Sequence, residues 1–290
     1  MIEAFSIIIQ VYNDLDGLKS TIKDLRVSLI PIRFEIVVVN DGSKRLISDW
    51  LTDQGIKEVS IKKRAGSYNA RNQGIEAAQF DHLLFVDAGV HIKPGWYDIA
   101  KNAIERNDYV AFSINMSVDE SMPLTKRYSE FYEFRCEMLW NQNHFGPTAF
   151  LWVSGRVFEE TGGFDHELWS GGDMELGNRC WHANFKMAFI PNNHIWHPPR
   201  SLREKYRKNV RILKGILKLK KKYPNRLMKL PKVGWKAFLL SPFKFIYTVY
   251  KVKSLPAYKS GKWKPITIAW SEFLHQTMYY LAMLKVLIKR

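Results

Sequence analysis

The sequence has few cysteines, neither of the two common glycine-rich nucleotide-binding motifs, and no long apolar run at its start. Each absence excludes or disfavours a class of protein. Of 290 residues only Cys136 and Cys180 are cysteines, without CxxC or Cys/His spacing, which excludes a disulfide framework and favours a reducing compartment. The opening MIEAFSIIIQVYND lacks a positive leading segment and a cleavage site, so we expect a cytosolic chain. Because GxGxxG and GxxxxGK[ST] are missing, a nicotinamide, flavin or P-loop enzyme is disfavoured.

Positive charge is concentrated in the last third of the chain. Residues 200–290 hold 24 Lys and Arg against 2 acidic residues, whereas residues 1–199 are mildly acidic, and the net charge is +16. This distribution predicts an enzyme-like domain over residues 1–200 and a basic appendage over 201–290 with an anionic partner. Lipid headgroups and nucleic acid both fit that charge, but no nucleic-acid recognition motif is present, so we expect no nucleic acid partner.

The first half of the chain alternates between short apolar runs and helix-like stretches. Residues 5–12, 34–41 and 82–87 are nearly continuous apolar runs typical of parallel strands covered on both faces, and residues 15–25 and 67–79 show helical spacing. This order predicts an α/β fold with an open, mostly parallel sheet flanked by helices. Because ligands bind beyond the carboxyl ends of such strands, Tyr12, Asp41 and Asp87 form one candidate site.

Asp41 and Asp87, and Arg71 in the helix-like stretch between them, also have plain structural explanations. Asp41 lies in the strong turn sequence NDGS, and Arg71 could be an ordinary helix-surface arginine. Asp87 ends the apolar run LLFV, where a carboxylate is costly to bury unless it is paired or metal-bound, although it could also cap the following turn.

A second candidate region is GGFDHELWSGGDMELGNRCW, residues 162–181. Asp173 and Glu175 follow Gly171 and Gly172 and lie in the first turn of an expected helix, where acids also complement the helix dipole. Trp169 offers a flat surface for a sugar, and the glycines would let a substrate hydroxyl approach a carboxylate that acts as general base. Further on, His194 and His197 lie in a loop bounded by prolines, without the spacing of a helical metal pair.

Taken together, the motifs resemble family-2 nucleotide-sugar glycosyltransferases of the GT-A fold over residues 4–200. The similar segments, in the family's order, are QVYND, VVVNDGSK, GSYNARNQG, FVDAGVHIKPGW, VSGRVFEETGGFDHEL and SGGDMELGNRC. Residues 169–200 are also similar to the polypeptide N-acetylgalactosaminyltransferases. The resemblance implies a nucleotide-sugar donor, in which a uridine diphosphate is held by Val11, Tyr12, Asp14, Asp41, Arg71, Asp87 and Ala88. It further implies that Trp169, Gly171 and Gly172 lie on the acceptor side and that Asp173 is the catalytic base.

The resemblance also implies a divalent cation, Mn²⁺ or Mg²⁺, bound by Asp87 and His197. Two residues depart from the family's pattern, since Gly89 replaces a second acidic ligand and Gly172 replaces the glutamate of a Glu-Asp pair. We expect Gly89 to weaken metal binding, and we rank His91 below His197 as a substitute ligand.

The favoured hypothesis is an inverting transferase that moves a sugar to a hydroxyl of a membrane-proximal glycan or lipid-linked acceptor. Two alternatives stay open, namely a degenerate module that only binds a nucleotide or glycan, and a retaining transferase acting on polypeptide.

The basic appendage contains three candidate helical or apolar segments, REKYRKNVRILKGILKLKKKY, WKAFLLSPFKFIYTVYKVK and ITIAWSEFLHQTMYYLAMLKVLIKR. In the last of them a single helical face would collect Ile266, Trp270, Phe273, Leu274, Leu281, Leu284 and Ile288. Packing on the enzyme domain would explain this face, but lysines interleaved with aromatic residues favour a helix lying on an anionic membrane. We therefore expect a cytoplasmic enzyme, peripheral on the inner face of a membrane.

Overall fold

The computed structural model describes residues 2–29, 32–43, 47–119, 121–127, 129–224 and 265–288. The chain divides into two compact units, Met1–Asn115 with Cys136–His197, and Met116–Arg135 with Pro198–Arg290. In the first unit the elements are β1 Ala4–Val11, α1 Leu15–Ser28, β2 Arg33–Asn40, α2 Ser48–Asp53, β3 Lys57–Ser60, α3 Ser67–Ala77, β4 His82–Asp87, β5 His91–Ile92, α4 Trp96–Arg106, β6 Tyr109–Phe112, β7 Asn115–Met116, α7 Cys136–Asn143, β8 Phe150–Ser154, α8 Gly155–Thr161, α9 Gly172–His182, β9 Met187–Ile190 and β10 Ile195–His197.

A mostly parallel sheet forms the centre of the first unit, as the apolar runs predict. Its strand order is β3-β2-β1-β4-β8-β6-β9. Strands β3, β2, β1 and β4 run parallel to one another, β6 and β9 are parallel, and β8 is antiparallel to both β4 and β6. The expected α/β class with an open sheet is therefore confirmed.

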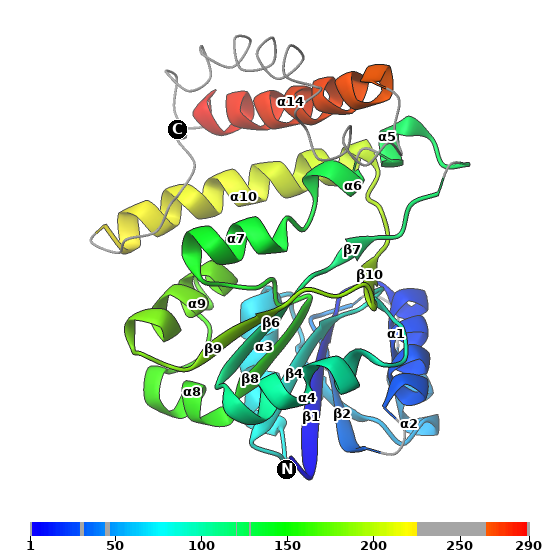
Figure 1. The fold of residues 1–290 in the computed structure, drawn as a ribbon, viewed down its shortest axis with the longest axis vertical. Helices are drawn as coiled ribbons and strands as arrows, with labels where there is room; N and C mark the ends of the chain where they lie inside the picture. The colour runs from blue at the N-terminus through cyan, green and yellow to red at the C-terminus, as the bar shows by residue number, and fades with distance from the viewer. Residues whose placement is uncertain are drawn as a thin grey trace. The chain divides into compact units, whose positions relative to one another are not determined.

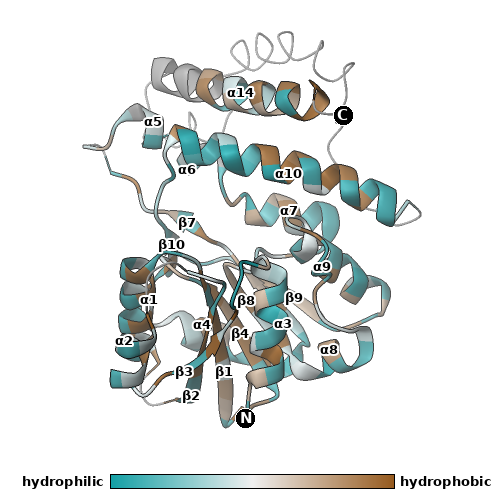
Figure 2. Ribbon diagram, turned by 180° about the vertical axis from the view of Figure 1, so that it is seen from behind, coloured by the Kyte–Doolittle hydropathy of each residue, from teal (hydrophilic) through white to brown (hydrophobic). Residues whose placement is uncertain are grey.

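Helices cover both faces of this sheet (Figure 1), and β1 illustrates why. Successive strand residues point to opposite faces, so Phe5 and Ile8 of β1 face different helices. Phe5 stacks on Tyr97 of α4, with ring centroids 6.2 Å apart. On the other face, α3 approaches so closely that a Cβ atom on Gly74 would lie 2.4 Å from Ile8. The central strands β1, β4 and β8 are accordingly mostly apolar (Figure 2), since both of their faces are buried.

A small second sheet of order β5-β10-β7 lies within reach of the turn that follows β4. In the antiparallel ladder of β10 and β5, Ile195 pairs with Ile92 and Trp196 with His91. Continuing this register by one residue brings His197 opposite Val90. His197 is thereby placed beside the segment just after Asp87, although the two residues are more than one hundred positions apart in the chain.

The second unit is helical and comprises α5 Leu124–Arg127, α6 Ser129–Tyr132, α10 Leu202–Lys222 and α14 Pro265–Ile288. Helix α10 begins with a capping box, in which Ser201 and Glu204 satisfy each other's backbone N–H groups. Its apolar side packs against α14, and the buried residues of this contact are Leu213, Ala282, Met283, Val286 and Leu287. None of the helices that the structure describes is both long and apolar enough to cross a bilayer.

The face that we predicted on the last helix can be compared only in part. Within the described side chains, Phe273, Leu281 and Ile288 are exposed, while the buried residues of α14 in the contact with α10 are Ala282, Met283, Val286 and Leu287. The side chains of Ile266 and Trp270, and the predicted apolar segment 235–253, lie outside the described residues.

A buried carboxylate ties the two chain segments of the second unit together. Glu133, with a fully buried side chain, is paired with Arg200 at 2.5 Å, Lys205 at 3.0 Å and Lys208 at 2.8 Å. Residues 116–135 therefore pack with the segment after His197, whereas the sequence boundary at residue 200 groups them with the first domain. The sequence pattern gave no sign of this pairing, because its partners are 67 or more positions apart.

Candidate active site

Three neighbouring strands end together and present the predicted site residues at one edge of the sheet. Val11, the last residue of β1, pairs with Asn40 of β2, and Gln10 pairs with Asp87 of β4. Tyr12, Asp41 and Asp87 consequently lie at adjacent strand ends. The inference that these three scattered residues share one edge is confirmed by the register of the sheet.

Asp41 is buried and holds the loop that leads into α3. Its carboxylate accepts hydrogen bonds from the backbone N–H groups of Ala65 at 2.7 Å and Gly66 at 3.1 Å. Its own N–H donates to the carbonyl of Val11 at 2.9 Å. Asp41 therefore shapes the site by fixing the loop, and its contact with a base stays a prediction.

An arginine that the sequence analysis did not single out links Tyr12 with Trp169. The Arg64 guanidinium lies 4.1 Å from the centroid of the Tyr12 ring and 5.7 Å from that of Trp169. Both rings are substantially exposed, Trp169 by 52%. A predicted donor-side residue and a predicted acceptor-side residue are thus joined through one cation.

Asp87 is paired with Arg71, another residue of the predicted donor site. Arg71 Nη2 donates to Asp87 Oδ1 at 2.6 Å, and the arginine side chain is only 5% exposed against 25% for the aspartate. Gln10 makes a longer contact with the same oxygen, at 3.5 Å. Burial of the aspartate is compensated by this charge-assisted bond, as the apolar run before it requires.

Asp14 and the turn after Asp87 have clear local roles. Asp14 is the N-cap of α1, and its carboxylate accepts the N–H of Gly17 at 3.0 Å. Beyond Asp87 and the half-buried Ala88, Gly89 has a φ of +88°, a backbone conformation that favours glycine. An aspartate at position 89 would carry backbone strain, so the structure does not favour a simple restoration of the missing ligand there.

The two histidines considered as metal ligands have different surroundings. His91 lies beside α1, with Nδ1 3.3 Å from the Asp24 carboxylate and 3.4 Å from the Ser20 hydroxyl. His197 is buried at the end of β10, at the register position of Val90. Among the described residues, no three His, Cys, Asp or Glu side chains are grouped to hold a metal. One carboxylate and one imidazole still form a donor set that suits Mn²⁺ or Mg²⁺ when substrate oxygens complete it.

Asp173 lies in the first turn of α9, as predicted, and is held by α3. The Tyr68 hydroxyl donates to Asp173 Oδ1 at 3.1 Å, and the backbone N–H of Met174 donates to the same oxygen at 3.1 Å. Burial raises the pKa of Asp173, and the opposing effects of Arg71 and the Tyr68 hydrogen bond are smaller. A carboxylate with a raised pKa at a site edge has the character of a general base.

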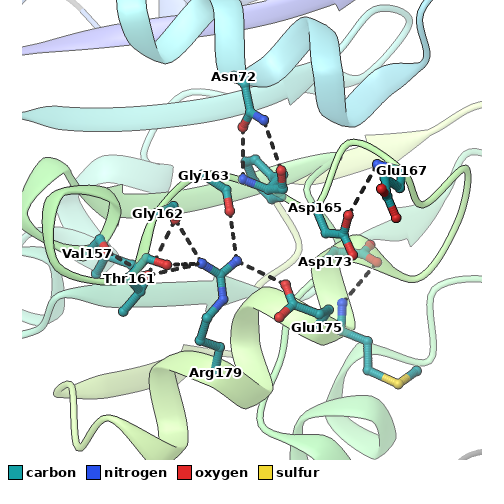
Figure 3. A network of polar contacts seen from close by, with 12 residues as sticks. Asn72, Val157, Thr161, Gly162, Gly163, Asp165, Glu167, Asp173, Glu175 and Arg179 are labelled. Atoms are coloured by element: carbon teal, nitrogen blue, oxygen red, sulfur yellow. Dashed lines mark hydrogen bonds and ion pairs between the residues drawn. The ribbon is translucent and has the colours of Figure 1, made fainter. Parts of the chain in front are cut away.

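The loop before α9 is fixed at several points, as Figure 3 shows. Asn72 of α3 exchanges two hydrogen bonds with the backbone of Phe164, at 2.8 and 2.9 Å. Arg179 donates to the carbonyls of Gly162 at 2.9 Å and Gly163 at 2.8 Å. Glu175 is buried and accepts from Arg179 at 2.9 Å, whereas Asp173 is bound by Tyr68 of α3.

The two predicted acceptor-side glycines have separate functions in this turn. Gly171 is the N-cap of α9 and has a φ of +90°. Gly172 lies against Tyr68, because a Cβ atom on it would be 2.8 Å from the tyrosine ring. Tyr68, Asn72 and Arg64 were the residues that sequence reasoning missed. Asn72 stands inside the Ala-Arg-Asn motif and could have been noted, whereas nothing in the sequence marks Tyr68 or Arg64.

Comparison with known proteins identifies the family. The family model for glycosyl transferase family 2 matches residues 6–162, more than half of the chain. The glycosyltransferase AglE of Haloferax volcanii is 26% identical over 222 residues, which cover 74% of this chain and 73% of AglE. Polypeptide N-acetylgalactosaminyltransferase 3 of Drosophila melanogaster is 23% identical over 201 residues, 58% of this chain, and the match spans 30% of that relative.

Solved structures agree on the fold. The mannosyltransferase PcManGT of Pyrobaculum calidifontis, in complex with GDP-Man and Mn²⁺, superposes with a TM-score of 0.62 at 15% identity, covering 97% of this chain and 86% of that one. S. aureus TarS in complex with UDP-GlcNAc gives a TM-score of 0.55 at 15% identity, with coverages of 97% and 90%. This chain therefore belongs to glycosyl transferase family 2 and has the GT-A fold of nucleotide-sugar glycosyltransferases.

Proposed function

We propose that the chain transfers a sugar from a uridine diphosphate donor to a hydroxyl of a membrane-proximal glycan or lipid-linked acceptor, with inversion. The observation that carries this proposal is the set of interactions that links Asp87, Arg71 and Asp173 at the edge of the sheet. Arg71 is buried between Asp87, which it pairs at 2.6 Å, and Asp173, whose pKa burial raises and Arg71 moderates. A base and a cation are thus held by the same short helix, α3, next to the strand ends.

In the proposed reaction, Asp173 removes the proton of the acceptor hydroxyl as its oxygen attacks the anomeric carbon. The bond from that carbon to the diphosphate oxygen breaks, and the leaving diphosphate takes the electron pair. Arg71 is the described cation that we assign to the developing charge. Attack from the side opposite the leaving group inverts the anomeric centre.

Asp87 and His197 are the residues that we assign to a divalent cation. When bound, the ion would supply charge neutralisation for the diphosphate without proton transfer. Asp87 already gives one oxygen to Arg71, so we expect weak metal binding that depends on the donor. The uridine assignment is supported by the TarS complexes with UDP and UDP-GlcNAc, whereas the GDP-Man complex of PcManGT makes guanosine donors the first alternative in a donor panel.

Asp173→Asn tests the assignment of the base. We expect donor hydrolysis to fall by about 10²-fold or more, the usual scale for loss of a general base, while UDP binding measured by calorimetry is retained. Asp98→Asn is the matched control, because Asp98 is exposed and lies on α4, which carries none of the predicted site residues. Unchanged hydrolysis of every sugar nucleotide in the panel, with and without Mn²⁺, would remove Asp173 from the mechanism.

For the location of the enzyme, we propose peripheral binding to an anionic membrane through the second unit. The support is an open apolar groove of about 430 Å³ between α10 and α14, with Arg203 and Lys285 among its lining residues. Leu281 and Ile288 line the same groove and are exposed, by 47% and 68%. Apolar side chains beside basic ones suit the boundary between acyl chains and acidic headgroups.

Vesicle flotation of the full chain tests this location. We expect binding to vesicles that contain phosphatidylserine, weaker binding at high salt, and a loss of binding in Leu281→Ser/Ile288→Ser. A Ser substitution at Val27, which is 57% exposed on α1 in the first unit, is the control. Point substitutions are preferable to removing residues 201–290, because that deletion would take Lys205 and Lys208 away from Glu133 and leave it only Arg200 of its three cations. Equal binding to neutral vesicles at high salt would refute the electrostatic account.

A further inference from the structure

The contact between Tyr68 and Gly172 concerns two positions that the family resemblance left unexplained. Gly172 stands where the family's pattern has the glutamate of a Glu-Asp pair. Tyr68 lies in the segment GSYNARNQG, two residues after Gly66 and two before Ala70. The structure brings these two residues together beside Asp173, which the proposed function assigns as base.

The tyrosine ring is confined on several sides. It is only 6% exposed, stacks on Phe164 with centroids 5.7 Å apart, and has the Arg71 guanidinium 5.6 Å from its centroid. A Cβ atom on residue 172 would lie 2.8 to 2.9 Å from three carbons of the ring, a separation at which the ring or the helix must shift. Because Phe164 is itself held through its backbone by Asn72, the ring has little room to retreat.

We propose that Tyr68 is the positioning residue of Asp173 and that Gly172 is required because the Tyr68 ring fills the space of a side chain there. Every L-residue other than glycine at position 172 then displaces the ring and withdraws the hydroxyl that holds Asp173 Oδ1 at 3.1 Å. In this proposal the glutamate of the family's pattern is absent at position 172, and the Tyr68 hydroxyl on α3 supplies a polar contact to Asp173 instead. The inference rests on the proposed function only for its effect on turnover.

The hydroxyl has a defined electrostatic effect. A donor to a carboxylate stabilises its charged form and lowers its pKa. Among the described residues, the charged and titratable side chains that interact with Asp173 include Arg71 and Tyr68 from α3 and the buried Tyr109 from β6. Of the two side chains that lower the pKa of Asp173, Tyr68 can be altered by the removal of a single oxygen atom.

Tyr68→Phe keeps the ring and removes the donor. We expect the pKa of Asp173 to rise by about one unit, the equivalent of one hydrogen bond to a charged group. The acid limb of the kcat/KM profile for donor hydrolysis should move to higher pH by the same amount, with the KM for donor little changed. Tyr97→Phe is the control, since the Tyr97 ring packs on Phe5 outside the site.

The pKa is to be measured directly, by titration of ¹³C-labelled aspartate carboxyl signals in the full chain, with the signal of Asp173 identified by its loss in Asp173→Asn. An unmoved pKa in Tyr68→Phe would overturn the positioning inference. A raised pKa without any change in the activity profile would support the contact and instead refute the role of Asp173 as base, so the two failures are distinguishable.

Gly172→Ala tests the steric half of the proposal. We expect about a tenfold or greater loss of hydrolysis in the native background and less than about a twofold further loss in Tyr68→Ala, because coupled positions are not additive. Circular dichroism and melting temperature establish that each variant is folded. Equal losses in both backgrounds would show that Gly172 is needed for a reason other than the Tyr68 ring, and would overturn the steric half of the proposal.

Discussion

Glu133→Gln removes the charge on which the second unit is assembled while it preserves the shape of the side chain. Burial alone would raise the pKa of Glu133, but Lys208, Lys205 and Arg200 outweigh it and hold the pKa well below its usual range. The side chain is inaccessible to solvent, and each of its three partners is less than a quarter exposed. The substitution therefore leaves three cations close together without their common counter-ion.

The size of the effect follows from this burial. Removing one partner of a buried ion pair costs about 3 to 5 kcal/mol. A melting temperature falls by about 2 to 4 °C per kcal/mol in a chain of 150–250 residues, so a decrease of roughly 6 to 20 °C is expected. Glutamine retains an acceptor oxygen, which favours the lower half of that range.

The effect should depend on pH in a defined way. Burial lowers the pKa of Lys208 to about 8, against the opposing effect of Glu133. Without Glu133 this pKa is lower still, so the folded variant binds fewer protons than its unfolded state over a wider range, and its stability rises with pH. The difference between the proteins thus shrinks as pH rises from 7 to 8. On the acid side, the stabilisation by Glu133 is complete above its unfolded pKa of about 4.3 and is lost progressively as pH falls from there toward its much lower folded pKa.

Urea unfolding followed by circular dichroism at pH 4, 6 and 8 measures these differences. Glu137→Gln is the matched control, because Glu137 is exposed four residues further on and should change stability by less than about 0.5 kcal/mol. Equal stability of Glu133→Gln and the native protein at pH 6 would refute the reasoning. A difference that is constant from pH 6 to 8 would refute the part assigned to Lys208.

Two further predictions concern the metal and the acceptor. A chelator should abolish donor hydrolysis and Mn²⁺ should restore it, whereas full activity in excess chelator would assign charge neutralisation to Arg71 instead. In the same assay we expect Gly89→Asp to bind Mn²⁺ no more tightly than the native protein, because the φ of +88° at this position costs an L-residue about 1 kcal/mol or more. Trp169→Ala, at a ring 52% exposed, should raise the KM of a glycan acceptor severalfold at unchanged donor KM, and an unchanged acceptor KM would remove Trp169 from the acceptor side.

The fold of the first unit was predictable because its signals are local. Apolar runs that end in polar residues gave β1, β2 and β4, and the spacing of Leu18, Ile22 and Leu25 gave α1, whose buried face contains all three. The rule that parallel strands bind ligands at their carboxyl ends then brought Tyr12, Asp41 and Asp87 together without any knowledge of distances.

The contacts within the site were not predictable, because they join residues that no periodicity relates. Tyr68 and Asp173 are 105 positions apart, and a tyrosine in the first turn of a helix reads as an ordinary buried residue. Glu133 and its cations show the same limit, since nothing in the sequence distinguishes Glu133 from its neighbours Glu130 and Glu137 as the acid that a basic helix will enclose. Sequence reasoning found the groups with obvious chemistry and missed those that hold them in place.

The pairing of Glu133 with residues beyond His197 has a consequence for the synthesis of the chain. Arg200 is added 67 residues after Glu133, and at about 5 to 20 residues per second this interval lasts roughly 3 to 13 seconds. During this interval the partners of Met116–Arg135 in the second unit have not yet been synthesised, whereas the strands of the first unit up to β9 are completed before it ends. Most of the sheet of the first unit can therefore form before residues 116–135 have their partners. The second unit can form only after its basic helix, α10, has been synthesised.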